Sequence, residues 1–322
     1  MHGPTIGPIP LEEIRAARER LAGTLLRTPL VRLNLDDAPA EIYLKLENLQ
    51  AIGSFKMRGA GNAMLLAGRD ALAEGVYTAS AGNMAQGVAW YARRMGVPCS
   101  VVVPDHAPDA KLTAIRRLGA TIVKVPFAEW MNVLKVRRYT GLSGYFVHPV
   151  SDVAVMAGNG TIGLEILEDL PDVDVVLVPF GGGGLSAGIA SAVRAVRPQT
   201  RILACEVETA APFAAALAAG APREITYTPS FVDGIGAPFV LPEMWPRLAG
   251  LLDGSLVMAL ADVAAAIRLL VERNHVIAEG AGATPVAAAV AGKAGGGKVV
   301  CVVSGGNIDL AKLRSILAGE LP

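Results

Sequence analysis

The chain alternates between two patterns of apolar residues, one typical of buried strands and the other of amphipathic helices. Short apolar runs recur along the sequence, and most are followed by a stretch in which apolar residues return every three or four positions. The runs predict strands at residues 42–46, 76–80, 98–103, 121–125, 144–147, 173–180, 201–206 and 298–304. The helical pattern predicts helices at residues 11–21, 56–67, 85–95, 109–118, 161–170, 185–197, 262–273, 284–291 and 308–317. This alternation predicts an α/β fold with a mostly parallel sheet and helices on both of its faces.

Three turns rich in glycine or serine directly follow predicted strands, at residues 80–83, 181–184 and 304–307. Ligands of parallel sheets bind beyond the carboxyl ends of the strands, so we expect the three turns to line one crevice. The stretch 126–144, which contains Trp130 and a cluster of basic residues, fits a solvated helix better than a mobile segment.

Composition and charge exclude several classes of protein. The 322 residues carry 29 basic and 29 acidic side chains, which argues against nucleic acid as a main partner. No signal-peptide pattern opens the chain and no apolar run is long enough to span a membrane. The three cysteines lie in strand-like runs, as buried thiols of a reducing compartment do. We therefore expect a cytoplasmic protein that uses neither nucleic acid nor a membrane as its partner.

Four consecutive glycines, Gly181, Gly182, Gly183 and Gly184, stand between a predicted strand and a predicted helix. Their bare amides at a helix N-terminus can close around a phosphate. No Lys-Ser/Thr pair follows, so the loop is not the phosphate loop of a nucleotide triphosphatase. The same glycines also fit a dinucleotide fingerprint, with Glu206 placed where a ribose-binding acid would be. An NAD-dependent dehydrogenase is therefore an open alternative at this point.

Lys56 is the second candidate for chemistry. It lies in the sequence Gly-Ser-Phe-Lys-Met-Arg-Gly, at the start of a predicted helix and between two apolar residues. Partial burial and the helix dipole both disfavour its ammonium form, and a lowered pKa makes lysine a nucleophile toward aldehydes. A lysine that forms an imine, combined with a phosphate-binding loop, suggests pyridoxal phosphate, which is both an aldehyde and a phosphate ester.

Taken together, these motifs carry a resemblance to a known family. The matching segments are Gly-Ser-Phe-Lys56-Met-Arg-Gly, Ser80-Ala-Gly-Asn83, Gly181 to Leu185 and Ser304-Gly-Gly-Asn307, with weaker matches at residues 148–149, 158–165, 232–234 and 279–282. The sequence resembles the serine/threonine dehydratase and serine racemase group of pyridoxal-phosphate enzymes, which have the tryptophan-synthase β fold (fold type II). The likeness extends from about residue 29 to residue 317.

The resemblance implies a two-domain α/β protein in which each domain is a mostly parallel sheet flanked by helices. Residues 1–50 and 147–322 would form the large cofactor-binding domain, and residues 51–146 would form a small mobile domain. It also implies a homodimer.

The resemblance further implies a role for each matching residue. Lys56 would hold the cofactor as an imine (a Schiff base), with Phe55 beside the ring. The amides of Gly181 to Gly184 and of Leu185 would bind the phosphate. The remaining expected contacts are Asn83 to the ring hydroxyl, Ser304 to the ring nitrogen, and Ser80, Ala81, Gly82 and Asn83 to the substrate carboxylate, with Gly234 and Glu279 also lining the site.

The implied activity is that of a dehydratase, or ammonia-lyase. It would eliminate water from a β-hydroxy amino acid such as L-threonine or L-serine and give a 2-oxo acid and ammonia. Lys56 would act as the general base for the α-proton. Alternatives are an eliminase for 3-hydroxyaspartate, phenylserine or a related amino acid, and an amino-acid racemase.

The sequence departs from the family pattern at several positions. Racemases of the group carry a serine where this chain has Ala81, which has no proton to give, so we expect little racemase activity. A histidine found after the asparagine in many members is Met84 here. An arginine that some members carry is replaced by Met131, beside Trp130, which leaves the substrate side chain undetermined.

The family's divalent-cation site is also incomplete in this sequence. Glu206 and the carbonyl of Ala210 match two of its ligands, but Pro212 stands where an aspartate is needed. Two ligands are too few for Mg²⁺ or Ca²⁺, so we expect Glu206 to be a satisfied strand-end carboxylate.

Overall fold

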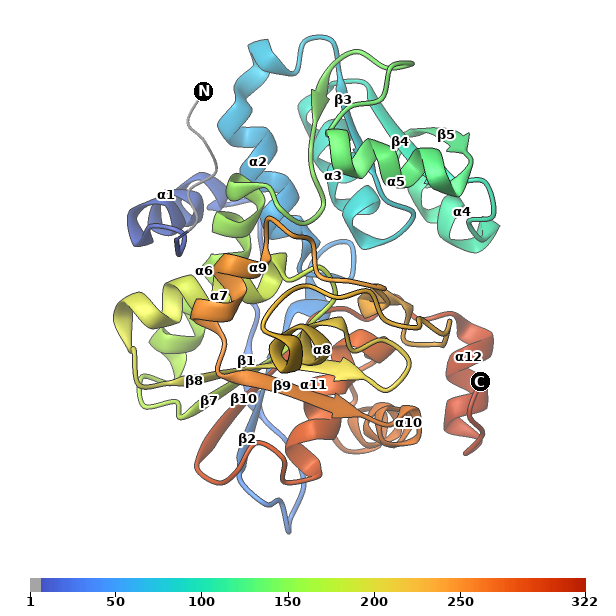
Figure 1. Ribbon diagram of the computed structural model, residues 1–322. Coiled ribbons are helices and arrows are strands. Elements are labelled where there is room, and N and C mark those ends of the chain that lie inside the picture. The colour runs from blue at the N-terminus through green and yellow to red at the C-terminus, as the bar shows by residue number, and fades with distance from the viewer. Residues whose placement is uncertain (1–6) are drawn as a thin grey trace.

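The computed structural model describes residues 7–322, which fold around two sheets (Figure 1). The strand order in the larger sheet is β1-β2-β10-β7-β8-β9, with bounds Leu30–Arg32 (β1), Glu41–Leu46 (β2), Lys298–Val303 (β10), Val175–Pro179 (β7), Arg201–Val207 (β8) and Gly254–Met258 (β9). All neighbouring strands are parallel except β1 and β2, which pair antiparallel. The predicted mostly parallel α/β architecture is therefore confirmed.

The smaller sheet forms the upper lobe in Figure 1 and is parallel throughout. Its strand order is β5-β4-β3-β6, with bounds Thr121–Val125 (β5), Cys99–Pro104 (β4), Val76–Ala79 (β3) and Tyr145–Phe146 (β6). These strands lie inside the segment 51–146 that the sequence assigns to a small domain. The division of the chain into domains at residues 50 and 147 stays a prediction.

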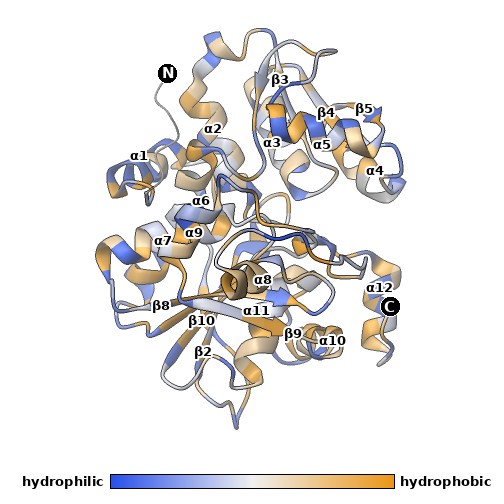
Figure 2. Cartoon of the chain, in the orientation of Figure 1, coloured by the Kyte–Doolittle hydropathy of each residue, from blue (hydrophilic) through white to orange (hydrophobic). Residues whose placement is uncertain are grey.

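Helices cover both faces of the larger sheet. The main helices of the chain are α1 (Leu11–Leu21), α2 (Lys56–Ala71), α3 (Asn83–Met95), α4 (Asp109–Arg117), α5 (Phe127–Val136), α6 (Val153–Asp169), α7 (Gly184–Val196), α8 (Pro212–Ala219), α9 (Trp245–Leu251), α10 (Leu260–Leu269), α11 (Gly280–Val290) and α12 (Leu310–Leu317). Shorter helical turns lie at η1 (Glu47–Leu49), η2 (Asp233–Ile235) and η3 (Leu270–Asn274). Helices α10, α11 and α12 pack on one face, and α1, α6, α7 and α9 pack on the other. Figure 2 shows the apolar colouring along β9, α8 and α10.

The central strand β10 shows why the strand patterns are continuously apolar. Val299 and Cys301 point into the core under α11, whereas Val300 and Val302 point into the core under α7. Each of these side chains is fully buried because successive residues of a strand face opposite sides of the sheet.

The smaller sheet is covered in the same way. Helices α2, α3 and α4 share a core with one face, and α5 packs against the other through Val133, Trp130 and Leu134. The stretch 126–144 thus contains the expected helix, but this helix has a packed side as well as a solvated one.

The elements differ from the predicted ones mainly at α6. This helix begins at Val153, where Asp152 caps it by accepting the N–H groups of Ala154 and Val155, and not at residue 161. Glycines between residues 158 and 163 concealed the helical pattern. They lie at close helix contacts: a Cβ on Gly158 would lie 2.3 Å from the Arg58 carbonyl of α2, and one on Gly160 would lie 2.9 Å from the Gly188 carbonyl of α7. Strands β1 and β9 and helices α8 and α9 were also not predicted.

Within residues 7–322, no helix is long and apolar enough to cross a membrane.

Candidate active site

Lys56 is the first residue of α2 and lies between the two sheets. Its Nζ donates a hydrogen bond to the Pro149 carbonyl at 3.3 Å and lies 5.0 Å from the centre of the Phe55 ring. Burial lowers the pKa of Lys56 to about 8, and the nearby negative charge of Glu279 opposes this shift. The amine is therefore closer to its nucleophilic, neutral form than an exposed lysine would be.

The turn before Lys56 pairs with residues 304–307, which we call the serine–asparagine turn. The N–H of Phe55 donates to the Ser304 carbonyl at 2.9 Å, and the N–H of Gly306 donates to the Gly53 carbonyl at 2.9 Å. Ser304 is almost completely buried at the end of β10. These bonds bring Ser304 next to the turn that carries Lys56, although the two residues are far apart in sequence.

Residues 181–184, which we call the glycine loop, connect β7 to the N-terminus of α7. Gly183 has φ +87°, a conformation that favours glycine, and caps the helix without any side-chain hydrogen bond. Within residues 7–322, the N–H groups of residues 181–186 have no acceptor, and the buried hydroxyl of Ser186 has no partner. Unsatisfied donors at a helix N-terminus fit an anion such as a phosphate.

The glycine loop tolerates no side chains on its packed side. A Cβ on Gly182 would lie 2.6 Å from the Val150 side chain, and one on Gly184 would lie 2.5 Å from the Val150 carbonyl. A Cβ on Gly181 would lie 3.2 Å from the Cα of Ile235. The loop is therefore a cradle of bare backbone, and it fits the phosphate end of pyridoxal phosphate.

Residues 80–83, which we call the substrate turn, connect β3 to α3. The N–H of Gly82 donates to the Ser80 hydroxyl at 3.3 Å, and Gly82 is the N-cap of α3 without a side-chain cap bond. A Cβ on Gly82 would meet no atom within 4 Å. The hydroxyl of Ser80 and the first amides of α3 thus form an open, half-buried turn that can accept a carboxylate.

Asn83 is held by two residues of the larger lobe, Glu279 before α11 and Asn307 after β10. Its Nδ2 donates to the two carboxylate oxygens of Glu279 at 3.0 and 3.3 Å, and its Oδ1 accepts from Asn307 Nδ2 at 2.8 Å. Asn307 Nδ2 also donates to the Ile52 carbonyl at 2.8 Å. An amide oxygen has two lone pairs, so Oδ1 of Asn83 can accept a second hydrogen bond, from a ligand.

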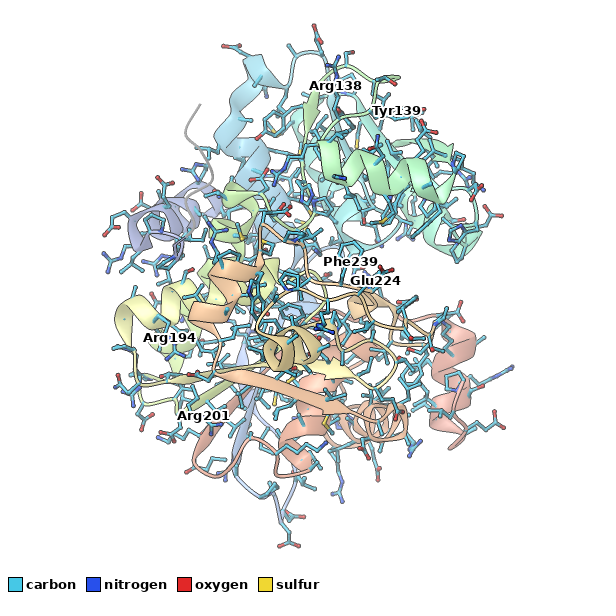
Figure 3. The ribbon with its side chains drawn as sticks, viewed as in Figure 1. Arg138, Tyr139, Arg194, Arg201, Glu224 and Phe239 are labelled. Carbon is cyan, nitrogen blue, oxygen red and sulfur yellow. The ribbon has the colours of Figure 1, made fainter. Side chains whose placement is uncertain are left out.

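Gly234 lies in the same cluster, since a Cβ on it would be 3.4 Å from Glu279 Oε1. A Cβ on Gly181 would also be 3.4 Å from the Gly234 carbonyl. The three predicted turns are therefore linked through Glu279 and Gly234, as expected of one crevice. Figure 3 labels Glu224 and Phe239 on the long segment between α8 and α9, at the level where the two lobes face each other.

Two residues singled out in the sequence take other places. Met84 is fully buried in the core of the smaller lobe and belongs to its packing. Trp130 packs against Phe127 on α5, with ring centres 5.7 Å apart, and its buried Nε1 has no partner in the described part of the chain.

The residues expected at a divalent-cation site do not fit one. The Glu206 carboxylate accepts the backbone N–H groups of Phe213 at 2.7 Å and Ala214 at 2.8 Å, together with the Ser255 hydroxyl. Pro212, where an aspartate would be needed, is the first residue of α8, a position that suits proline. The carboxylate is therefore used to cap the N-terminus of α8.

The second candidate ligand, Ala210, lies in a tight turn in which its N–H donates to the Val207 carbonyl at 2.8 Å. Among the residues that the structure describes, no group of three or more His, Cys, Asp or Glu side chains could hold a metal ion. The Glu206 carboxylate is thus used within the fold, and the geometry around Glu206 and Ala210 does not support a metal site there.

Sequence reasoning did not identify Asn307, Pro149 and Val150 as parts of the site. Asn307 and Pro149 lie inside motifs that the family resemblance marks, but the sequence gives no contact for either. Val150 carries no chemical group that would distinguish it from a core residue, and only the packing against Gly182 and Gly184 shows its place.

Comparisons with known proteins agree with this geometry. A family model described as "Pyridoxal-phosphate dependent enzyme" matches residues 21–305. An L-threonine ammonia-lyase of Geobacter sulfurreducens is 41% identical over 315 residues, covering 96% of this chain and 78% of the relative. A catabolic L-threonine dehydratase of Escherichia coli K12 is 36% identical over 316 residues, covering 96% of each chain.

Among solved structures, maize serine racemase superimposes with a TM-score of 0.88 and 32% sequence identity, covering 98% of both chains. The expected fold, fold type II with two mostly parallel sheets flanked by helices, is therefore the fold of this protein.

Proposed function

The chain belongs to the family of pyridoxal-phosphate-dependent enzymes, and we propose that it is an L-threonine ammonia-lyase. The reaction converts threonine to 2-oxobutanoate and ammonia, with one water released by elimination and one consumed by hydrolysis. The observation that carries the proposal is the position of Lys56, an amine with a lowered pKa. Its Nζ bonds to the Pro149 carbonyl, and the next residue, Val150, packs against the bare amides of the glycine loop.

The choice of threonine rests on the relatives. The names printed for the Geobacter and Escherichia proteins both give L-threonine as the substrate, and this chain aligns with them over 96% of its length. The racemase likeness is structural, and this chain has Ala81 in the substrate turn, where racemases of the group have a serine that acts as an acid and base.

Different residues of the site would bind different parts of the cofactor. Lys56 would hold its aldehyde carbon, the amides of residues 181–185 its phosphate, and Asn83 its ring hydroxyl. When bound, pyridoxal phosphate supplies an electron sink next to the α-carbon of the amino acid. Ser304 would meet the ring nitrogen with a neutral hydroxyl, which moderates that sink and suits elimination at the β-carbon.

The substrate turn would bind the amino-acid carboxylate through the Ser80 hydroxyl and the first amides of α3. This contact orients the α-proton toward Lys56. A pKa near 8 leaves part of the amine unprotonated at neutral pH, as a general base for this proton requires.

A panel assay tests the proposal. The purified, cofactor-loaded protein is mixed with L-threonine, L-serine, 3-hydroxyaspartate or phenylserine, and release of the 2-oxo acid is measured. We expect the highest kcat/KM for L-threonine, and D-serine as a minor product from L-serine because Ala81 has no proton to give. Lys56→Ala should abolish turnover and leave the circular dichroism spectrum unchanged.

Other outcomes would replace the proposal. A higher kcat/KM for 3-hydroxyaspartate or phenylserine would reassign the substrate, and D-serine as the main product would reassign the reaction. A colourless protein that binds NAD would support the dehydrogenase alternative. A homodimer and a cytoplasmic location stay predictions.

A further inference from the structure

Residues 148–151, which we call the histidine turn, lead from β6 into α6. The turn lies where the two sheets meet, and it contacts both halves of the proposed cofactor site. His148 and Ser151 are buried, whereas Pro149 and Val150 are half-buried and face the site.

His148 determines the conformation of this turn. Its Nδ1 accepts the backbone N–H of Val150 at 3.1 Å and that of Ser151 at 2.9 Å. Both bonds require a neutral ring with an unprotonated Nδ1. Burial, with the positive charges of Arg137 and Lys56, lowers the pKa of His148 to about 4, and a hydrogen bond with the Leu134 backbone opposes this shift. The ring is therefore a permanent acceptor at neutral pH.

The two residues that His148 holds in place contact the two ends of the site. The Pro149 carbonyl accepts the hydrogen bond of Lys56 Nζ at 3.3 Å. Val150 forms the wall of the glycine loop, because its side chain fills the space beside Gly182 and its carbonyl the space beside Gly184. A change in the turn would thus move the acceptor of the lysine and the wall of the phosphate cup together.

The turn is also connected to the smaller lobe. Arg137, which follows α5 with φ +57°, donates from Nη2 to the Ser151 hydroxyl at 2.6 Å. The same hydroxyl donates to Glu243 of the larger lobe at 3.1 Å. The hydroxyl also lies 3.3 Å from His148 Nδ1, so the contacts with Arg137 and Glu243 meet the histidine at Ser151.

We propose that His148 is a positioning residue. It fixes the spacing between Lys56 and the glycine loop so that one cofactor molecule can bind both. This inference rests on the proposed use of Lys56 and the glycine loop for pyridoxal phosphate. It does not depend on which amino acid is the substrate. His148 acts on the site through Pro149 and Val150 and does not itself touch the cofactor or the substrate.

The test measures how fast the holoenzyme loses its cofactor. Excess 4′-deoxypyridoxine 5′-phosphate, which has the phosphate but no aldehyde, is added to the coloured protein, and the decay of visible absorption is followed. We expect His148→Leu, which lacks the acceptor, to lose the cofactor roughly tenfold faster than the wild type, as the loss of buried hydrogen bonds predicts. The kcat for the substrate should fall while its KM stays unchanged, because the substrate turn is not contacted.

A conservative pair separates positioning from general destabilisation. His148→Asn places a carbonyl oxygen near the position of Nδ1 and should retain the cofactor better than His148→Gln, whose carbonyl lies one bond further out. The matched control is Thr78→Val, which removes a buried 2.8 Å hydrogen bond to the Val147 carbonyl just before the turn. It should lower Tm but leave the rate of cofactor loss unchanged.

Two results would overturn the inference. One is a folded His148→Leu protein that loses its cofactor at the wild-type rate, and the other is equal loss from the Asn and Gln variants. If wild-type protein holds the cofactor on Lys56 but does not act on threonine, the proposed function fails while this inference remains testable by the same decay.

Discussion

The glycine loop and the substrate turn occupy equivalent places, each between a parallel strand and the N-terminus of a helix, but their surroundings are opposite. Gly184 has the Val150 carbonyl where a Cβ would be, at 2.5 Å, whereas a Cβ on Gly82 would meet nothing within 4 Å. The first turn is closed on its packed side by neighbouring residues, and the second is open. This difference suits a site that keeps one phosphate permanently and exchanges a carboxylate in every cycle.

The largest expected effect is a loss of unfolding free energy at low pH, caused by protonation of His148 beside the glycine loop. The unfolded chain binds a proton on this histidine near pH 6.5, but the folded chain only near pH 4. Between these values the unfolded state binds more protons, so lowering the pH destabilises the fold by up to about 3 kcal/mol. Urea unfolding at pH 7 and pH 4 measures this loss.

His148→Asn supplies the control for the acid effect. Between pH 7 and pH 4 this variant should lose less unfolding free energy than the wild type. Its carboxylates still titrate in that range, but it lacks the histidine. Equal losses would show that His148 is not held neutral by the fold.

Gly184→Ala tests the packed turn directly. The new methyl group must displace the Val150 backbone, which should cost about 1–3 kcal/mol of unfolding free energy. The displaced wall should also weaken retention of the cofactor. Thermal unfolding and visible absorption after dialysis check both effects, and an alanine variant with wild-type Tm and colour would contradict the close packing.

Gly82→Ala is the matching change in the open turn and should have the smallest effect on stability. A Cβ on Gly82 would meet no atom within 4 Å, so the unfolding free energy should change by less than about 0.5 kcal/mol. The methyl group narrows the turn, and KM for L-threonine should rise several-fold while the cofactor stays bound. A large loss of Tm would show that this turn is packed like the other.

The sequence identified the candidate site residues better than it identified the residues that pack around them. Lys56, Asn83 and Ser304 stand in short motifs whose chemistry depends on residue type, and the structure brings them to one crevice. Val150 and Asn307 could not be assigned in this way, because their contacts depend on how α6 and the serine–asparagine turn pack. The start of α6 at Val153 was missed for a related reason, since its glycines serve close packing with α2 and α7 and hide the helical pattern.

Glu206 shows the opposite case, in which a family motif pointed to a ligand that the fold uses otherwise. Its carboxylate caps α8, whose first residue is Pro212. The carboxylate has the hydrogen-bond partners expected of a satisfied strand-end residue.

The most direct test of the central claim is to reduce the holoenzyme with borohydride and map the modified residue by mass spectrometry. Reduction makes the bond between cofactor and lysine permanent. We predict one phosphopyridoxyl group per chain, on Lys56. A label on another lysine, or no label on a coloured protein, would contradict the account.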